Sequence, residues 1–117
     1  MTALKISERN SGETTILDLE GKVVLGEEST ALREAIRRLL DAGQRSILLN
    51  LSGVAAIDSS GLGTLVSCYA TAHKEGARVG LYGLSKRIND VMAVTKLMTV
   101  FDLYQDEKTA TAGVAAA

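Results

Sequence analysis

A short polar hexapeptide, residues 58–63 with the sequence DSSGLG, separates two apolar segments near the middle of the chain. On its amino-terminal side, residues 46–51 are almost continuously apolar, which is typical of a strand that is covered on both faces. On its carboxyl-terminal side, the apolar residues from about Ser60 to Glu75 recur at helical spacing, and Gly76 follows them. The sequence therefore predicts that a buried strand passes directly into a helix at this hexapeptide.

The residue types of the hexapeptide fit the start of a helix. Asp58, Ser59 and Ser60 carry oxygens that accept hydrogen bonds from the free N–H groups of a first helical turn. Gly61 and Gly63 each cost a helix about 1 kcal/mol relative to alanine, and the expected benefit is bare backbone that another surface can approach closely. Two hydroxyls at a helix N-terminus also suit a phosphate group. On the residues alone, a simple capping cluster and a phosphate-bearing site both remain open.

Strands and helices are predicted to alternate along the chain. Alternating or β-forming residues indicate strands at 4–8, 14–20, 46–51, 78–83 and 100–104, and Gly21 is expected to end the second of them. Helical spacing follows Ser29 as far as Gly43 and resumes after the hexapeptide and after Ser85, and a helix-prone tail begins at Asp106. This alternation favours βα crossovers and a mostly parallel sheet. We expect one domain over residues 1–117, with about 109–117 frayed.

The composition argues against several classes of partner. A net charge of −1 gives no electrostatic reason to expect direct binding to nucleic acid or to an anionic membrane. No apolar run approaches the roughly 20 residues that cross a bilayer, and no signal peptide is evident. We therefore expect a cytoplasmic protein without membrane insertion, and a monomer, since no long apolar surface helix is evident. The single cysteine, Cys68, lies on an apolar helix face and is expected in the core.

Catalysis and cofactor binding are poorly supported by the residues. A serine nucleophile needs a base within hydrogen-bond reach, but the only histidine, His73, lies fourteen helical residues from Ser59, or roughly 20 Å. Gly61 and Gly63 form half of a dinucleotide fingerprint, but Val66 stands at the position of its third glycine, and no Walker lysine follows. No cluster of His and Cys indicates a metal site. We expect no enzyme activity, no metal and no cofactor.

Three blocks of the sequence resemble the STAS domain, the fold of bacterial anti-sigma factor antagonists. The segment 50–63, which contains NLS and ends in IDSSGLG, resembles the signature of that family. The segment 21–26 (GKVVLG), followed by Leu32-Arg33, resembles its second block, and residues 95–97 with 100–101 resemble its third. The resemblance covers nearly the whole chain. It implies a mixed, mostly parallel sheet of four to five strands with about four helices packed on it, and it places the signature at the start of the second helix.

The resemblance also implies a function, that of an anti-sigma factor antagonist. In that family the unmodified protein binds an anti-sigma factor, which is also a serine kinase, and thereby frees a sigma factor to join RNA polymerase. The kinase phosphorylates the hydroxyl residue directly after the aspartate of the motif, which maps to Ser59 here, and the complex dissociates. A metal-dependent Ser/Thr phosphatase restores the active form. Ser60 is the fallback acceptor, and it could instead cap the helix while Ser59 is presented to the kinase.

The partner surface that this reading predicts has three parts. They are the hexapeptide itself (Asp58, Ser59, Ser60, Gly61, Leu62 and Gly63), the exposed face of the helix that follows it, and the segment from Gly21 to Gly26. The family often has an acidic residue directly after the first glycine of that segment, whereas this chain has Lys22.

Two other roles for a STAS domain stay open. One is a stand-alone accessory subunit of a lipid-transport ABC complex, which would bind its ATPase constitutively and use the serines of the hexapeptide for docking. The other is a scaffold in a large stress-signalling assembly. The paired serines of the full signature favour the phosphorylation switch over both alternatives. A small enzyme or a nucleotide-binding protein is the reading from a different class, and the residues disfavour it.

Overall fold

The alternation of strands and helices predicted from the sequence is present in the structure, a computed structural model that describes residues 4–23, 27–96 and 101–115. Within these residues there are five strands and four helices, as the resemblance implied. In chain order they are β1 (Leu4–Ser11), β2 (Thr14–Val23), α1 (Glu27–Asp41), β3 (Ser46–Ile57), α2 (Ser59–Lys74), β4 (Arg78–Tyr82), α3 (Lys86–Thr95), β5 (Asp102–Tyr104) and α4 (Glu107–Ala115).

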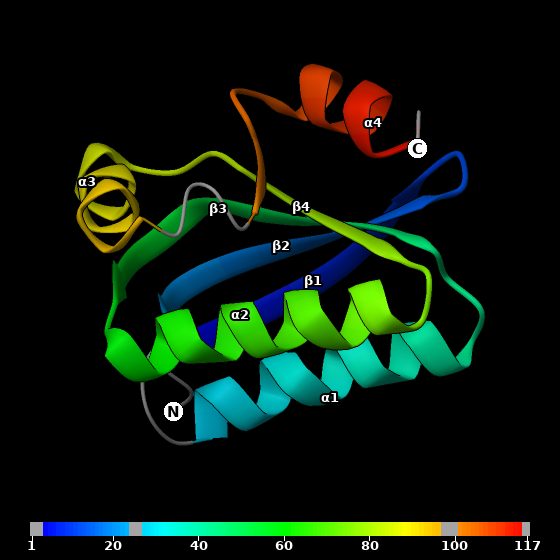
Figure 1. Ribbon diagram of the computed structural model, residues 1–117, viewed down its shortest axis with the longest axis horizontal. Helices are drawn as coiled ribbons and strands as arrows, with labels where there is room; N and C mark the ends of the chain where they lie inside the picture. The colour runs from blue at the N-terminus through cyan, green and yellow to red at the C-terminus, as the bar shows by residue number, and fades with distance from the viewer. Residues whose placement is uncertain (1–3, 24–26, 97–100, 116–117) are drawn as a thin grey trace.

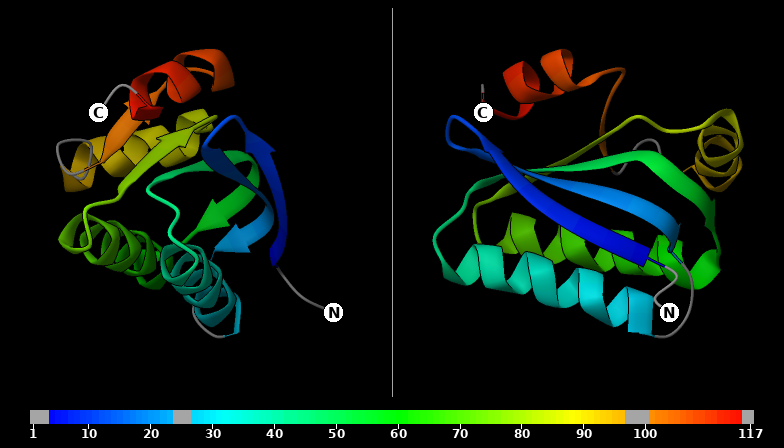
Figure 2. Two further views of the ribbon diagram at one scale, coloured as in Figure 1. Left: turned by 90° about the vertical axis from the view of Figure 1, so that its right-hand side faces the viewer. Right: turned by 180° about the vertical axis from the view of Figure 1, so that it is seen from behind.

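The five strands form one sheet in the order β1-β2-β3-β4-β5. A hairpin turn with Gly12 at φ +63° makes β1 antiparallel to β2, and every other neighbouring pair is parallel. Because each parallel step moves the same way across the sheet, right-handed connections bring the connecting helices to one face. Figure 1 and Figure 2 show α1 and α2 side by side under that face, α3 at one end of the sheet and α4 on the opposite face.

Two apolar cores lie on the two faces of the sheet. Successive residues of a strand point to opposite faces, so Leu17 and Leu49 join the larger core while their neighbours Ile16 and Leu48 join the smaller one. This explains why β3 reads as a continuous apolar run. The larger core lies between the sheet and the helices α1 and α2. It includes Leu19, Val23, Leu32, Ile36, Leu39, Leu40, Ile47, Leu51, Leu65, Val79, Leu81, Ile88 and Met92.

Several boundaries differ from those predicted. Gly21 does not end β2, because its φ of +111° lets the strand continue through an irregular register as far as Val23. Helix α1 begins at Glu27, before Ser29, and it ends before Gly43, which adopts the left-handed φ of +89° expected of a helix stop. Strand β3 continues past residue 51 to Ile57, and β5 comprises residues 102–104. Residue 100, where β5 was predicted to start, lies outside the described residues.

The predicted frayed tail is instead a packed helix. Ala110 and Val114 of α4 are buried against Ile16, Leu48 and Tyr82 on the second face of the sheet. Gly113 allows a close approach to β5, because a Cβ built there would lie 2.3 Å from Cε1 of the Tyr104 ring. The small residues of this segment, which favoured the prediction of fraying, therefore allow the helix to lie close to the sheet. Residues 116 and 117 lie outside the described part.

Polar side chains join α4 to the β1–β2 hairpin. The Nε atom of Arg9 donates to Oδ2 of Asp18 at 2.6 Å, and Arg9 also pairs with Glu107 at the start of α4. The Tyr82 hydroxyl donates to Oε1 of Glu107 at 2.9 Å. The Arg9 guanidinium holds the pKa of both carboxyls below its usual value. Burial and the bond to Glu107 raise the pKa of Tyr82 to about 12.

The raised pKa of Tyr82 predicts a loss of stability in alkaline solution. The neutral phenol favours the folded state, so its contribution is full below the ordinary pKa of 10 and is lost as the pH rises through about 12. Between pH 9 and pH 11 we expect the wild type to lose about 1 kcal/mol more unfolding free energy than Tyr82→Phe. Urea unfolding of both proteins at the two pH values measures this. Equal losses in the two proteins would contradict the prediction.

Candidate functional site

The hexapeptide forms the junction between β3 and α2, and Asp58 is its capping residue. Oδ1 of Asp58 accepts a hydrogen bond from the N–H of Gly61 at 2.7 Å, and the Asp58 carbonyl accepts one from the N–H of Leu62 at 2.9 Å. The expectation that Ser60 caps the helix is therefore wrong, since Ser60 lies inside the first turn of α2. An extended backbone at Asp58, with ψ at −177°, turns the chain from strand to helix.

Gly61 and Gly63 have different roles, although both were expected to leave room for another surface. Gly61 is buried, and a Cβ built on it would lie 1.9 Å from the carbonyl oxygen of Val23 and 2.9 Å from Cγ1 of Ile57. Its bare backbone therefore accommodates β2 of the same chain. Gly63 is exposed, and a Cβ built there meets nothing within 4 Å. Only Gly63 leaves bare backbone open to a partner.

The two serines also differ in their surroundings. Ser59 is exposed, whereas Ser60 is half-buried and its carbonyl accepts a hydrogen bond from the buried Thr64 hydroxyl at 3.0 Å. Ser59 and Gly63 are four residues apart on α2, so they lie one above the other on the same side of the helix. Leu62, which was predicted as part of the partner surface, is 8% exposed and packs in the larger core. The exposed surface of the hexapeptide therefore consists of Asp58, Ser59 and Gly63.

The end of β2 lies directly against the hexapeptide. Val23 pairs with Ile57 in the sheet, and its carbonyl accepts a hydrogen bond from the N–H of Asp58 at 3.3 Å. Gly21, which was predicted as part of the partner surface, therefore lies near the hexapeptide. The exposed Lys22 follows it and pairs with Ala56 of β3. Gly26 lies outside the described residues. The sequence pattern did not single out Val23, because its contact is made by a backbone carbonyl.

The other reactive side chains lie away from this surface. His73 is exposed in the last turn of α2 and stacks on Tyr69 with 6.0 Å between ring centroids. Cys68 is buried, as predicted, and burial raises the pKa of its thiol to about 11. In the described part of the chain, no group of three or more His, Cys, Asp or Glu is arranged to hold a metal ion. The helices seen there also lack the length and apolar character required to traverse a bilayer.

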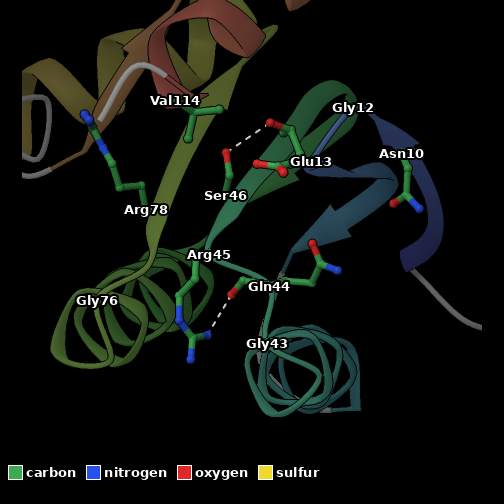
Figure 3. A pocket seen from close by; sticks show the side chains of 11 residues that line it. Asn10, Gly12, Glu13, Gly43, Gln44, Arg45, Ser46, Gly76, Arg78 and Val114 are labelled. Atoms are coloured by element: carbon green, nitrogen blue, oxygen red, sulfur yellow. Dashed lines mark hydrogen bonds between the residues drawn. The ribbon is translucent and has the colours of Figure 1, made fainter.

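A polar cavity of about 620 Å³ lies among the turns that precede the parallel strands, at the end of the sheet opposite to the hexapeptide (Figure 3). Arg45 and Arg78 line it. Arg45 donates to the carbonyls of Leu40 and Gln44 at 3.3 and 2.9 Å, where α1 ends. A helix C-terminus carries partial negative charge, which a guanidinium complements and an added anion would oppose. Arg45 is therefore explained as a helix-end partner rather than as a ligand group.

This architecture matches that of a known protein family. The family model described as "Mlab, STAS domain" matches residues 6–104, from β1 through β5. The chain belongs to the STAS domain family, which confirms the resemblance seen in the sequence.

Solved structures share the same fold at low sequence identity. An anti-sigma factor antagonist from Mycobacterium paratuberculosis is 20% identical and superimposes with a TM-score of 0.84 over 96% of this chain and 94% of that one. A Thermotoga maritima protein assigned as an anti-sigma factor antagonist is 21% identical, with a TM-score of 0.83 over 94% of both chains. The Bacillus cell fate determinant SpoIIAA in its phosphorylated form is 19% identical, with a TM-score of 0.68 over 89% of this chain and 95% of that one.

Proposed function

We propose that this protein is an anti-sigma factor antagonist controlled by phosphorylation of Ser59. In its unmodified form it binds an anti-sigma factor that is also a serine kinase, so that a sigma factor is released. Phosphorylation of Ser59 ends the binding, and a Ser/Thr phosphatase restores it. The observation that carries this proposal is that the hydroxyl of Ser59 is exposed at the start of α2 while the residues around it hold the loop in place.

Membership of the STAS family supports the proposal, as does a fold shared with proteins that are named anti-sigma factor antagonists. One of these, SpoIIAA, has been solved in both unphosphorylated and phosphorylated forms. A binding protein also fits better than an enzyme, because His73 lies at the far end of α2, roughly 20 Å along the helix from Ser59. The protein would act in the cytoplasm as a monomer.

The geometry explains how one phosphate could switch a partner without unfolding the domain. A phosphate adds about −1.5 to −2 charges at pH 7. The positive N-terminal end of α2 stabilises a negative charge by roughly 0.3–1 kcal/mol, whereas the neighbouring Asp58 carboxylate repels it. These two effects oppose each other within the fold. A partner packed on Ser59 and Gly63 would meet the whole dianion, together with its bulk over the bare backbone of Gly63.

Capture of partners from a native lysate tests the proposal. The baits are the wild type, Ser59→Ala, Ser59→Asp and Ser11→Asp, and the captured proteins are identified by mass spectrometry. Ser11 is an exposed serine in the hairpin at the opposite end of the sheet, so its variant controls for added charge alone (Figure 1). We expect every bait except Ser59→Asp to capture an ATP-binding serine kinase. A fifth bait, Ser60→Asp, tests whether Ser60, the fallback acceptor, is the phosphorylated residue instead.

Other patterns of capture would point to the other roles. A transporter ATPase bound equally by all the baits would identify a lipid-transport subunit, and a large stress-signalling assembly would identify a scaffold. In either case Ser59 serves docking or local structure, and the phosphorylation switch would be abandoned.

A further inference from the structure

The helix α4 buries fewer large apolar side chains against the sheet than α1 or α2. It buries two small apolar side chains, Ala110 and Val114, against the second face of the sheet. In contrast, α1 buries four large side chains and α2 buries Leu62, Leu65 and Cys68 in the larger core. A helix of nine residues is too short to be stable alone in water, so α4 depends on what holds it down.

Gly113 also packs on the ring of Tyr104, and charged and polar side chains add to this attachment. Glu107, at the start of α4, pairs with Arg9 and accepts a hydrogen bond from the Tyr82 hydroxyl. Arg9 is itself fixed by two hydrogen bonds to Asp18, at 2.6 and 3.2 Å, and Asn50 holds Asp18 from the next strand at 2.7 Å. If α4 moved away, Arg9 would keep its bonds to the hairpin and would lose only those to Glu107.

The two charged groups that would separate are accessible to water, and the buried Tyr82 hydroxyl would keep a hydrogen bond from Arg9 at 3.2 Å. The side chains of Arg9 and Glu107 are 42% and 43% exposed, so breaking their contact would leave no charge buried without a partner. The connection between β5 and α4 consists of Gln105 and Asp106, and Asp106 caps the helix by accepting from the N–H of Thr109 at 2.8 Å. The helix could thus move as a unit about these two residues while its first turn stays capped.

We propose that α4 is a cover latched to the sheet by Arg9 and Glu107, and that it opens while the sheet, α1 and α2 stay folded. Opening uncovers the apolar side chains of Ile16 and Leu48, which lie under α4 in the closed form. Figure 2 shows α4 on the opposite side of the sheet from α1 and α2. The inference does not depend on the proposed function, because the hexapeptide takes no part in the latch.

Amide hydrogen exchange on the full chain, followed by mass spectrometry of peptides, tests this cover. In the wild type, the amides of residues 107–115 are expected to exchange at least about tenfold faster than those in the middle of α1 and α2. Arg9→Ala and Glu107→Gln should each accelerate exchange in α4 by a further factor of about ten and leave α1 and α2 unchanged. Circular dichroism of each variant checks that it is folded.

Arg38→Ala is the matched control for loss of an exposed ion pair. Arg38 belongs to α1, on the other side of the sheet from α4, and pairs with Glu8 of β1 at 2.6 Å. This variant should leave exchange in α4 unchanged. The proposal is overturned if α4 is as protected as α1 and α2 in the wild type, if Arg9→Ala accelerates all helices equally, or if Arg38→Ala opens α4 to the same extent.

Discussion

Gly61→Ala is expected to lower the unfolding free energy by about 3 kcal/mol or more. The added methyl group would lie 1.9 Å from the carbonyl oxygen of Val23 and 2.8 Å from its carbonyl carbon, and both atoms belong to the backbone of β2. No side-chain rotation relieves that overlap, so either β2 or the start of α2 must move. Because Val23 is paired with Ile57, such a movement would disturb the sheet as well. Urea unfolding followed by circular dichroism measures the loss.

Gly63→Ala provides the matched control, since it adds the same atom two residues later in the same helix. The space around Gly63 is open, and alanine is the better helix former. This variant is therefore expected to raise stability by about 0.5–1 kcal/mol. If both substitutions changed stability by the same amount, the contact between Gly61 and Val23 would not be what requires glycine at position 61.

Phosphorylation of Ser59 is expected to weaken binding to the anti-sigma factor more than 100-fold. This prediction rests on the proposed function. A misplaced charge in an interface costs several kcal/mol, and each 1.4 kcal/mol is a factor of ten in affinity. Isothermal titration calorimetry with the captured kinase compares the unmodified protein, the Ser59-phosphorylated protein and Ser11→Asp. The Ser11 variant should bind like the unmodified protein.

The same phosphorylated protein should keep its fold. Ser59 is exposed, and Asp58 already caps α2, so the phosphate is not needed to support the helix and meets no buried neighbour. Amide exchange of the phosphorylated form should therefore leave protection in β2, β3 and β4 unchanged. Broad loss of protection across the sheet would mean that the switch acts by unfolding the domain rather than by changing the partner's contact surface.

The sequence predicted the architecture because the period of the apolar residues is a local property. The apolar run in β3 and the capping residues at 58–60 located the junction correctly to within one or two residues. Local patterns could not separate Gly61 from Gly63, however, because the difference lies in a carbonyl that reaches Gly61 from Val23. Local patterns also could not show that Ser59 is exposed whereas Ser60 is half-buried.

The attachment of α4 was beyond local patterns for the same reason. Its alanines and glycine gave no strong apolar face, so fraying was a reasonable expectation. Besides the buried Ala110 and Val114, the helix is held by a pairing between Arg9 and Glu107, which lie 98 residues apart in the chain. Such a pairing becomes visible only when the sheet has brought the first strand beside the last helix.

The packing of Gly61 on the end of β2 means that the hexapeptide is not a portable module. The backbone on both sides of the two serines is positioned partly by the carbonyl of Val23, which lies 35 residues before Asp58 in the chain. Grafting DSSGLG onto the start of an unrelated helix would transfer the capping residue and the hydroxyl without the end of β2 that packs against them. A designer who wanted to move this site into another scaffold would need to carry the strand end with it.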